Sequence, residues 1–136
     1  MGYLLIVHAQ DANDIVTPIV TGLRRLDLDC LTYKEKLKIA PLGSIVIHLL
    51  EDMVETASVV LAFASPALLS DYKALSITDY AAAQGNLIFC KLPGASTGDL
   101  PPSFYRASCG LELSAQPEAQ LTQIMSVLDA QLNPHF

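Results

Sequence analysis

The sequence has few of the features that mark a disulfide-rich, a membrane-spanning or a nucleic-acid-binding protein. Its three cysteines are odd in number and widely spaced, which fits free thiols in a reducing compartment better than a disulfide framework. No apolar run approaches the roughly 18 residues that are needed to cross a bilayer. The apolar stretch Tyr3–Val7 has no basic residues ahead of it and is too short for a signal peptide. We therefore expect a cytoplasmic domain without a membrane span.

Charged residues are also sparse, at 16% of the chain against 51% hydrophobic residues. Fourteen acidic residues outnumber eight basic ones, for a formal net charge of -6. The basic residues are scattered apart from Arg24-Arg25 and the group Lys34, Lys36 and Lys38, so no nucleic-acid-binding surface is expected. No His, Cys, Asp or Glu cluster has metal-ligand spacing, so no metal site is expected. The apolar excess indicates a dense core or a surface buried against a partner or a second copy.

The pattern of the 136 residues predicts one domain, residues 1–136, in which strands alternate with helices. Strands are expected at Tyr3–Val7, Leu28–Tyr33 (near a sheet edge), Ser58–Ala64, Asn86–Cys90 and Ala107–Leu113. A first helix is expected to carry the apolar stripe Ile15–Leu26. Three more helices are expected over Ser44–Ala57, Ala67–Gln84 and Gln116–Leu132. Repeated β-α units of this size predict an α/β fold, a flavodoxin-like doubly wound five-stranded parallel sheet with helices on both faces.

Prolines and glycines predict where regular structure is interrupted. Pro18 is expected in the first turn of the first helix, where a missing N–H costs little. The basic segment Lys34–Gly43 is expected to be irregular, because Pro41 and Gly43 break regular structure. The Pro/Gly/Ser-rich segment Pro93–Ser103 is expected to be a loop.

The segment Ala57–Tyr72, ASVVLAFASPALLSDY, is the most informative part of the chain. Its strand has no polar alternation, which indicates burial on both faces in the middle of a parallel sheet. Ligand sites in such sheets lie beyond the carboxyl ends of the strands, so chemistry is expected at Ser65 and Pro66. A phosphate-accepting receiver domain needs a carboxylate there, and the chain offers none. The first strand leads into HAQDAND, which does not resemble a Gly-rich dinucleotide loop.

Three segments resemble Toll/interleukin-1 receptor (TIR) domains, in the family's order and over nearly the whole chain. The segment LLIVHAQDAND resembles the first strand and acidic loop of the family. The segment LDLDCLTYKEKLKIAPLGSIV resembles the family's second strand and its so-called BB loop. The most specific match is VETASVVLAFASPALLSDY, which resembles the family's central strand followed by Ser-Pro, a hydrophobic pair, Ser and Trp.

The resemblance implies two activities. Many TIR domains are signalling modules that associate with other TIR domains, partly through the BB loop and neighbouring helices. Others cleave NAD⁺ at the nicotinamide–ribose bond or make cyclic ADP-ribose products. The cleavage uses a Glu on the third helix, one turn after the Trp, to bind the ribose hydroxyls and stabilise the oxocarbenium-like charge. NAD would then be a substrate, so no cofactor is expected in either case.

The chain departs from the family at both positions. It has no tryptophan, and Tyr72 takes that position, while Ser76 takes the position of the catalytic glutamate. A serine hydroxyl carries no negative charge, so the electrostatic stabilisation of the developing cation is missing. Asp79 lies three residues further and so close to Ser76 on the helix surface. It is either a displaced catalytic acid or a solvated surface charge, whereas Asp71 is expected to complement the helix dipole from the first turn.

Five further side chains are candidate ligand contacts. His8 matches a histidine of the family pattern and is expected either to bond a loop backbone or to contact a ligand. Asp11 is expected near the ligand or as a cap of the first helix. Ser65 lies at the end of the central strand. Tyr33 and Tyr72 suit stacking on a nicotinamide or adenine ring, or packing.

The expected BB loop carries the predicted interface. The family's adjacent Pro-Gly is here Pro41-Leu42-Gly43, with one residue between. Ile39 and Leu42 have no assigned place in the core, and their exposure would favour a protein contact. The predicted interface with a second copy or another TIR domain comprises Ile39, Pro41, Leu42 and Gly43.

Three functions follow, in order of preference. The first is a TIR-like signalling and interaction domain, as in innate immunity, with NAD⁺ hydrolysis degraded or absent. The second is an NAD⁺ nucleosidase, a hydrolase or cyclase, with Asp79 as displaced acid. The third is a flavodoxin-like phosphoryl-carrier or ligand-binding domain that uses His8, because a strand-end histidine also suits phosphotransfer. TIR domains are commonly parts of multidomain chains, so this chain can be a piece of a longer protein.

Overall fold

The computed structural model describes residues 3–39, 43, 46–93 and 100–132. Its strands form one fully parallel five-stranded sheet in the order β2-β1-β3-β4-β5. They are β1 (Leu4–Val7), β2 (Cys30–Thr32), β3 (Val59–Ala64), β4 (Leu87–Lys91) and β5 (Cys109–Glu112). After β2 the chain crosses to the other side of β1, which is the reversal that defines a doubly wound sheet. The predicted flavodoxin-like fold class is therefore confirmed.

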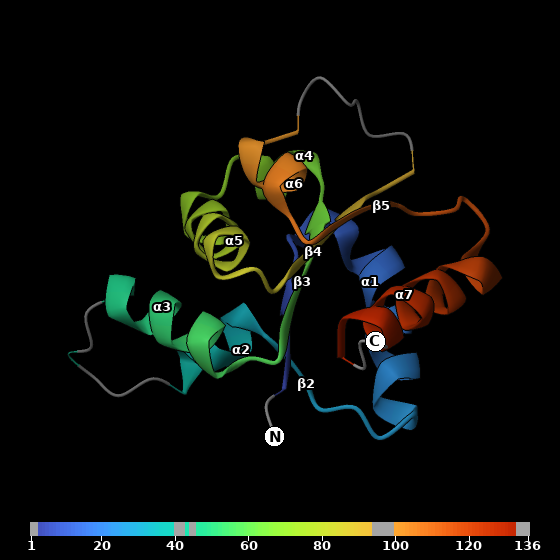
Figure 1. Ribbon diagram of the computed structural model, residues 1–136, viewed down its shortest axis with the longest axis horizontal. Coiled ribbons are helices and arrows are strands. Elements are labelled where there is room, and N and C mark those ends of the chain that lie inside the picture. Colours follow the sequence, from blue (N-terminus) through green and yellow to red (C-terminus); the bar gives the residue numbers. More distant parts are fainter. Residues whose placement is uncertain (1–2, 40–42, 44–45, 94–99, 133–136) are drawn as a thin grey trace.

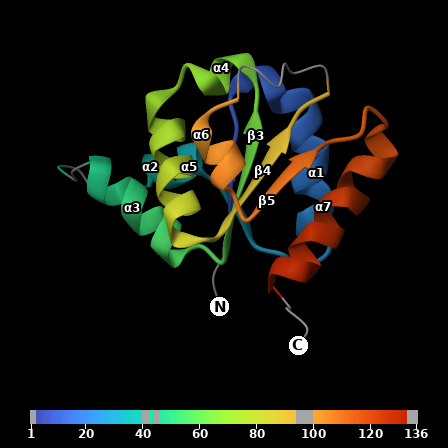
Figure 2. The same cartoon turned by 45° about the horizontal axis from the view of Figure 1, so that its top comes forward.

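Helices cover both faces of the sheet (Figure 1). They are η1 (Gln10–Ala12, a 3-10 turn), α1 (Asn13–Arg25), α2 (Tyr33–Lys38), α3 (Val46–Thr56), α4 (Pro66–Leu69), α5 (Tyr72–Gln84), α6 (Pro102–Arg106) and α7 (Pro117–Leu132). Helices α1 and α7 lie on one face, and α2, α3 and α5 lie on the other. Figure 2 shows α4 above the carboxyl end of β3, where the predicted site begins. In the described part of the chain, no helix is long and apolar enough to cross a membrane.

The central strand β3 supplies both halves of the core. All six of its residues are buried, as its unbroken apolar sequence predicts. Val59, Leu61 and Phe63 belong to the cluster under α1 and α7, and the alternate residues of the strand belong to the cluster under α3 and α5. This alternation follows from the period of two in a β-strand. The strand therefore packs against both helical layers and fixes their positions relative to each other.

Both edge strands are shorter than the sequence pattern predicts. β2 begins at Cys30 instead of Leu28, and β5 covers Cys109–Glu112 instead of Ala107–Leu113. Short edge strands limit unwanted pairing with other chains. The predicted edge position of the second strand is confirmed.

The expectation of an irregular Lys34–Gly43 segment is wrong for its first half, which forms most of α2. Thr32 and Glu35 form a capping box: Thr32 Oγ1 accepts from the Glu35 N–H at 3.1 Å, and Glu35 Oε1 accepts from the Thr32 N–H at 3.2 Å. The two bonds satisfy two N–H groups at the start of the helix. The Thr-x-x-Glu pattern of this capping box is present in the sequence and predicts a helix start. Pro41 and Gly43, on which the expectation of irregular structure was based, lie after the end of the helix.

The helix predicted over Ala67–Gln84 is two helices, because the chain breaks at Ser70 and Asp71. Asp71 was expected inside the first turn, but it is the N-cap of α5. Its Oδ1 accepts bonds from the backbone N–H groups two and three residues ahead, at 3.0 and 3.3 Å. Ser70 and Asp71 are both residue types that favour the N-cap of a helix, so their adjacent positions inside the expected helix indicated this break. The helix ends at Gly85, whose φ of 78° is a left-handed conformation that suits glycine.

Three further expectations are wrong. Pro18 lies in the second turn of α1, where it has no N–H to donate to the carbonyl of Asp14. Leu26, expected in the apolar stripe, is the C-cap residue and is 52% exposed. The expected loop Pro93–Ser103 is wrong for its last two residues, because α6 begins at Pro102, a favoured residue for a first turn, while residues 94–99 lie outside the described residues.

Candidate functional site

The strand-end residues of the predicted site lie along one edge of the sheet. His8 follows β1, Tyr33 follows β2, and Ser65 follows β3. These three strands are parallel neighbours, so their carboxyl ends meet at the same edge. The structure therefore brings these three residues to the edge where doubly wound folds bind ligands.

Asp11 links the loop after β1 to the start of α4. Its Oδ1 accepts from the buried Ser65 hydroxyl at 2.6 Å, and its Oδ2 accepts from the Ala67 N–H at 3.1 Å. The bond from Ser65 is the main reason that the pKa of Asp11 is lowered. Ser65 Oγ in turn accepts from the Leu68 N–H at 3.3 Å as the N-cap of α4. Asp11 thus supports α4, whereas α1 has no side-chain cap, so the expectation that Asp11 caps the first helix is wrong.

Tyr33 is bonded to Asp71 and lies in the core. Its side chain is 2% exposed, and its hydroxyl donates to Asp71 Oδ2 at 2.5 Å. Burial, followed by the bond to the carboxylate, raises the pKa of Tyr33. Burial also acts to raise the pKa of Asp71, but the bonds from Tyr33 and the two amides outweigh it, and that pKa is lowered. One carboxylate therefore joins the first residue of α2 to the start of α5, and the Tyr33 ring is not open to stacking.

Neither ring nitrogen of His8 is free for chemistry, because one is bonded to Asn13 and the other is buried. Its Nε2 lies 2.9 Å from Asn13 Oδ1, and its Nδ1 is buried and has no hydrogen-bond partner among the described residues. A neutral ring that donates from Nε2 to Asn13 fits both facts, because the buried nitrogen then carries no proton. Burial lowers the pKa of His8 from its ordinary 6.5; the Asn13 bond opposes this shift, Lys34 adds to it, and Glu35 opposes it. A phosphoryl carrier needs an accessible ring nitrogen, so this geometry does not favour that function.

The residues at the family's catalytic positions lie elsewhere, in an open groove between α3 and α5. The groove has a volume of about 370 Å³ and is lined by Leu50, Glu51, Ser76, Asp79, Tyr80 and Ala83. Ser76 Oγ donates to the Tyr72 carbonyl one turn earlier, at 2.8 Å. Asp79 Oδ1 lies 3.9 Å from Arg106 Nη2, and both side chains are more than half exposed. The serine thus offers no charge, and the charge of Asp79 is partly offset by an arginine.

The candidate residues do not converge on one cavity. His8 lies in a separate hollow of about 180 Å³ beside α1, together with Arg24 and Glu35. Tyr72 is 72% exposed at the start of α5. Ligand pockets usually enclose about 300–1,000 Å³. The α3–α5 groove reaches that size, but it contains Ser76 and Asp79 without the strand-end residues.

The predicted interface residues lie at and beyond the end of α2. Ile39 is the C-cap of α2 and is 74% exposed. Gly43 has a φ of 83°, and a Cβ added there would meet nothing within 4 Å, so only its backbone conformation calls for glycine. Pro41 and Leu42 lie outside the described residues.

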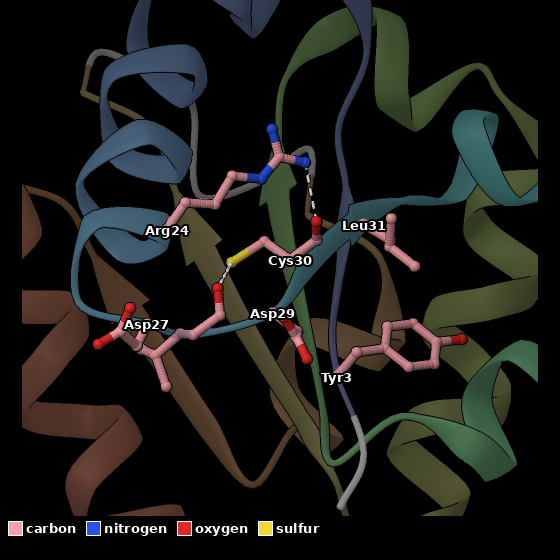
Figure 3. A pocket seen from close by; sticks show the side chains of 7 residues that line it. Tyr3, Arg24, Asp27, Asp29, Cys30 and Leu31 are labelled. Atoms are coloured by element: carbon pink, nitrogen blue, oxygen red, sulfur yellow. Dashed lines mark hydrogen bonds between the residues drawn. The ribbon is translucent and has the colours of Figure 1, made fainter.

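Sequence reasoning assigned no role to Arg24, which lies at the outer edge of β2 beside a hollow (Figure 3). The Asp29 carbonyl accepts from the Leu4 N–H of β1 at 2.7 Å, so the next carbonyl, that of Cys30, points outward. Arg24 Nη2 donates to this outward carbonyl at 2.8 Å and lies 3.6 Å from Glu35 Oε1. The arrangement occupies a group that another strand would need, so β2 is protected against edge pairing.

The described residues contain no group of three or more His, Cys, Asp or Glu that could hold a metal ion. All three cysteines are free thiols, and Cys30 and Cys90 are buried. Burial raises the pKa of Cys30 to about 11 and also raises that of Cys90. Buried thiols of this kind are chemically inert.

We expect Tyr33→Phe to lower the free energy of unfolding by about 1–2 kcal/mol, because it removes a donor from a partly buried carboxylate. Tyr80→Phe is the matched control, since the Tyr80 hydroxyl donates to Glu55 at 2.6 Å on the exposed surface. Its loss should cost less than about 0.5 kcal/mol. Urea unfolding measures both values, and equal losses would contradict the structural role of the Tyr33–Asp71 bond.

The lowered pKa of His8 predicts a pH-dependent stability. As the pH falls below 6.5, the unfolded state takes up a proton that the folded state resists, so the free energy of unfolding decreases. We expect His8→Gln to remove this part of the decrease between pH 7.5 and pH 5. The pKa of Asp11 and that of Asp71 lie below their ordinary 3.8, outside this window. Urea unfolding across the window tests this, and parallel curves for the two proteins would contradict it.

The comparisons with known proteins identify the fold. No protein-family model matches the sequence, and no curated protein matches it. The TIR domain of the Toll-related receptor TRR-2 from Hydra magnipapillata has a TM-score of 0.68 at 11% identity, over 96% of this chain and 98% of that one. A metazoan TIR-STING receptor from C. gigas, solved in complex with 2',3'-cGAMP, has a TM-score of 0.67 at 20% identity over 96% of this chain. A second structure of a metazoan TIR-STING receptor from C. gigas has a TM-score of 0.62 at 18% identity over 97% of this chain.

The two TIR-STING chains are longer proteins, of which this chain covers 39% and 40%. It covers 98% of the Hydra TIR domain, so the match there extends over the whole domain. Identities of 11–20% establish a common fold and leave activity open. The chain therefore has the fold of a TIR domain, as the resemblance of its three segments predicts.

Proposed function

We propose that this chain is a cytoplasmic TIR-type signalling and interaction domain with degraded or absent NAD⁺ hydrolysis. It associates with a second copy or with another TIR domain through α2 and the residues that follow it. The fold supports this role, because the similar structures include a Toll-related receptor and a TIR-STING receptor. The free, buried thiols of Cys30 and Cys90 support a reducing compartment.

The observation that carries the interaction proposal is the exposure of Ile39. Its side chain is 74% exposed, although it follows directly on a helix that is anchored to the core through Tyr33. Because α2 is anchored, the Ile39 side chain at its end is held at the surface and cannot turn inward to the core. Exposed apolar groups rimmed by polar residues, here by Lys38 and its neighbours on α2, are typical of protein interfaces.

The loss of hydrolysis is supported by the geometry of Ser76. Cleavage of NAD⁺ builds positive charge on the ribose, and a carboxylate close to the ring stabilises it. Ser76 has no charge, and its hydroxyl proton is directed to the Tyr72 carbonyl of its own helix at 2.8 Å. The position therefore lacks the group on which the reaction depends.

We expect Ile39→Asp to weaken self-association by about tenfold or more, because a buried carboxylate replaces an apolar anchor at the interface. Leu42→Asp tests the following segment in the same way. Sedimentation over a range of concentrations measures the effect.

Leu26→Asp is the matched control for this experiment. Leu26 is an exposed apolar residue at the end of α1, and the substitution changes its charge by the same amount. It should leave association unchanged. Equal effects of Ile39→Asp and Leu26→Asp would contradict a specific role for the end of α2.

One observation favours NAD⁺ cleavage as a second candidate function. Asp79 and Ser76 line the same groove, so a displaced carboxylate lies near the family's catalytic position. The nearby Arg106 weakens this candidate, because its positive charge opposes the stabilisation of a cation.

We expect no release of nicotinamide from NAD⁺, either by dilute protein or by protein concentrated enough to assemble. Chromatography of the reaction mixture measures the product. Turnover that persists in Asp52→Asn, an exposed acid of α3, and disappears in Asp79→Asn would establish the second function and refute the absence of hydrolysis.

A further inference from the structure

The α3–α5 groove has an acidic rim. Helices α3 and α5 pack side by side (Figure 2), and the groove between them receives Glu51 from α3 and Asp79 from α5. Glu55 lies one turn after Glu51 and accepts a bond from the Tyr80 hydroxyl at 2.6 Å, which raises the pKa of Tyr80 to about 12. The buried Leu50 supplies apolar lining. The groove therefore offers an apolar contact framed by carboxylates.

The surface of α2 has the opposite character. Lys34 and Lys38 are exposed and four residues apart, so they lie on one side of the helix, about 6 Å apart along its axis. Glu35, the acidic residue of this helix, lies 3.6 Å from Arg24 and is therefore largely neutralised. The helix ends in Ile39, which is 74% exposed. The result is a short basic helix with an apolar end.

We infer that α2 of one copy of this chain docks into the α3–α5 groove of a second copy. The inference rests on the proposed function, because it names the partner and the surface that receives α2. Ile39 contacts the apolar lining near Leu50, and the two lysines of α2 lie against the carboxylates of the rim. Lys34 and Lys38 lie on one side of α2, and Glu51 and Asp79 line the groove, so two ion pairs form when α2 lies in it.

Lys38 on α2 and Glu51 at the groove remain available for a partner, whereas Lys34 lies 6.0 Å from the centre of the Tyr33 ring. Within the described part of the chain, the recorded ion pairs are Arg24–Glu35, Lys91–Glu112 and Arg106–Asp79. None of them uses Lys38 or Glu51. The contact of Asp79 with Arg106, at 3.9 Å and largely exposed, is weak enough for a lysine of the partner to compete with it.

The two surfaces differ, so the contact is heterologous. After it forms, one copy retains a vacant groove and the other a vacant α2. We therefore expect growing head-to-tail chains of copies and not a closed dimer. Exposed ion pairs are screened by salt, so assembly weakens as the ionic strength rises. Arg24 protects the β2 edge, so strand pairing at that edge does not compete with this contact.

Charge reversal on each surface tests the inference. The first variant is Lys34→Glu with Lys38→Glu, and the second is Glu51→Lys with Asp79→Lys. Each alone should self-associate about tenfold or more weakly than the unaltered chain, because like charges then meet at the rim. Mixed in equal amounts, they should associate and grow again, because the unaltered α2 of the second variant fits the unaltered groove of the first, and the two reversed surfaces are complementary to each other. Arg25→Glu, on α1, reverses one charge away from both surfaces and should have no effect.

Sedimentation at low and high salt measures these species, and circular dichroism establishes that each variant is folded. Should the second variant not fold, Glu51→Gln with Asp79→Asn replaces it. This variant should weaken self-association, and mixed with the first variant it should form a 1:1 complex that does not grow, because only the pair of unaltered surfaces remains. Association that is unchanged in folded reversal variants, or reversals that do not rescue each other, would overturn the docking contact. In those cases the proposed function stands if Ile39→Asp still weakens association. An unaltered chain that does not self-associate at any concentration overturns the docking contact as well, and the proposed function then depends on a different TIR domain.

Discussion

The burial of β3 on both faces is the constraint on which the rest of the structure depends. Its six residues lie between two helical layers, and an unpaired polar group there would cost several kcal/mol, on the order of 2–7. Polar side chains are therefore excluded until the strand ends at Ser65. The first hydrogen-bonding side chain after the strand is therefore Ser65, at the carboxyl edge of the sheet. The loops there must be held by side chains, since the ladder of backbone bonds has ended.

Two carboxylates provide that support, and each connects parts of the chain that are far apart in sequence. Asp11 bonds the Ser65 hydroxyl and the Ala67 N–H, and so joins the loop after β1 to α4. Asp71 bonds Tyr33 and the first amides of α5, and so joins α2 to α5. Because both carboxylates are already satisfied within the fold, the edge is organised for structure. Lys38 and Glu51, which take part in no ion pair among the described residues, are better suited to contacts with another protein.

Much of the fold could be predicted from local patterns. The apolar runs around Leu5, Val60 and Ile88 identified the buried strands, and the spacing of Val16, Ile19 and Leu23 identified α1, because burial leaves a period of 2 or 3.6 in the sequence. Helix ends were less predictable. The Thr32–Glu35 capping box and the Asp71 cap compete with nearby proline, glycine and helix-forming residues, and their balance is settled by tertiary bonds such as that between Tyr33 and Asp71. That Ser76 lies on a helix could be predicted, but its bond to the Tyr72 carbonyl could not.

The sequence by itself determined the parallel α/β architecture, the resemblance to TIR domains and the serine at the place of the family's acid. These depend on the identity and spacing of residues that are close together in the chain. Only the tertiary structure decided that Asp11 supports α4, that Tyr33 is buried against Asp71, and that Arg24 closes the β2 edge. It also decided that Glu51 and Asp79 share one groove while His8 lies in another. The physical reason is that these relations join residues that are separated by many positions, and packing of the helices on the sheet determines which of them meet.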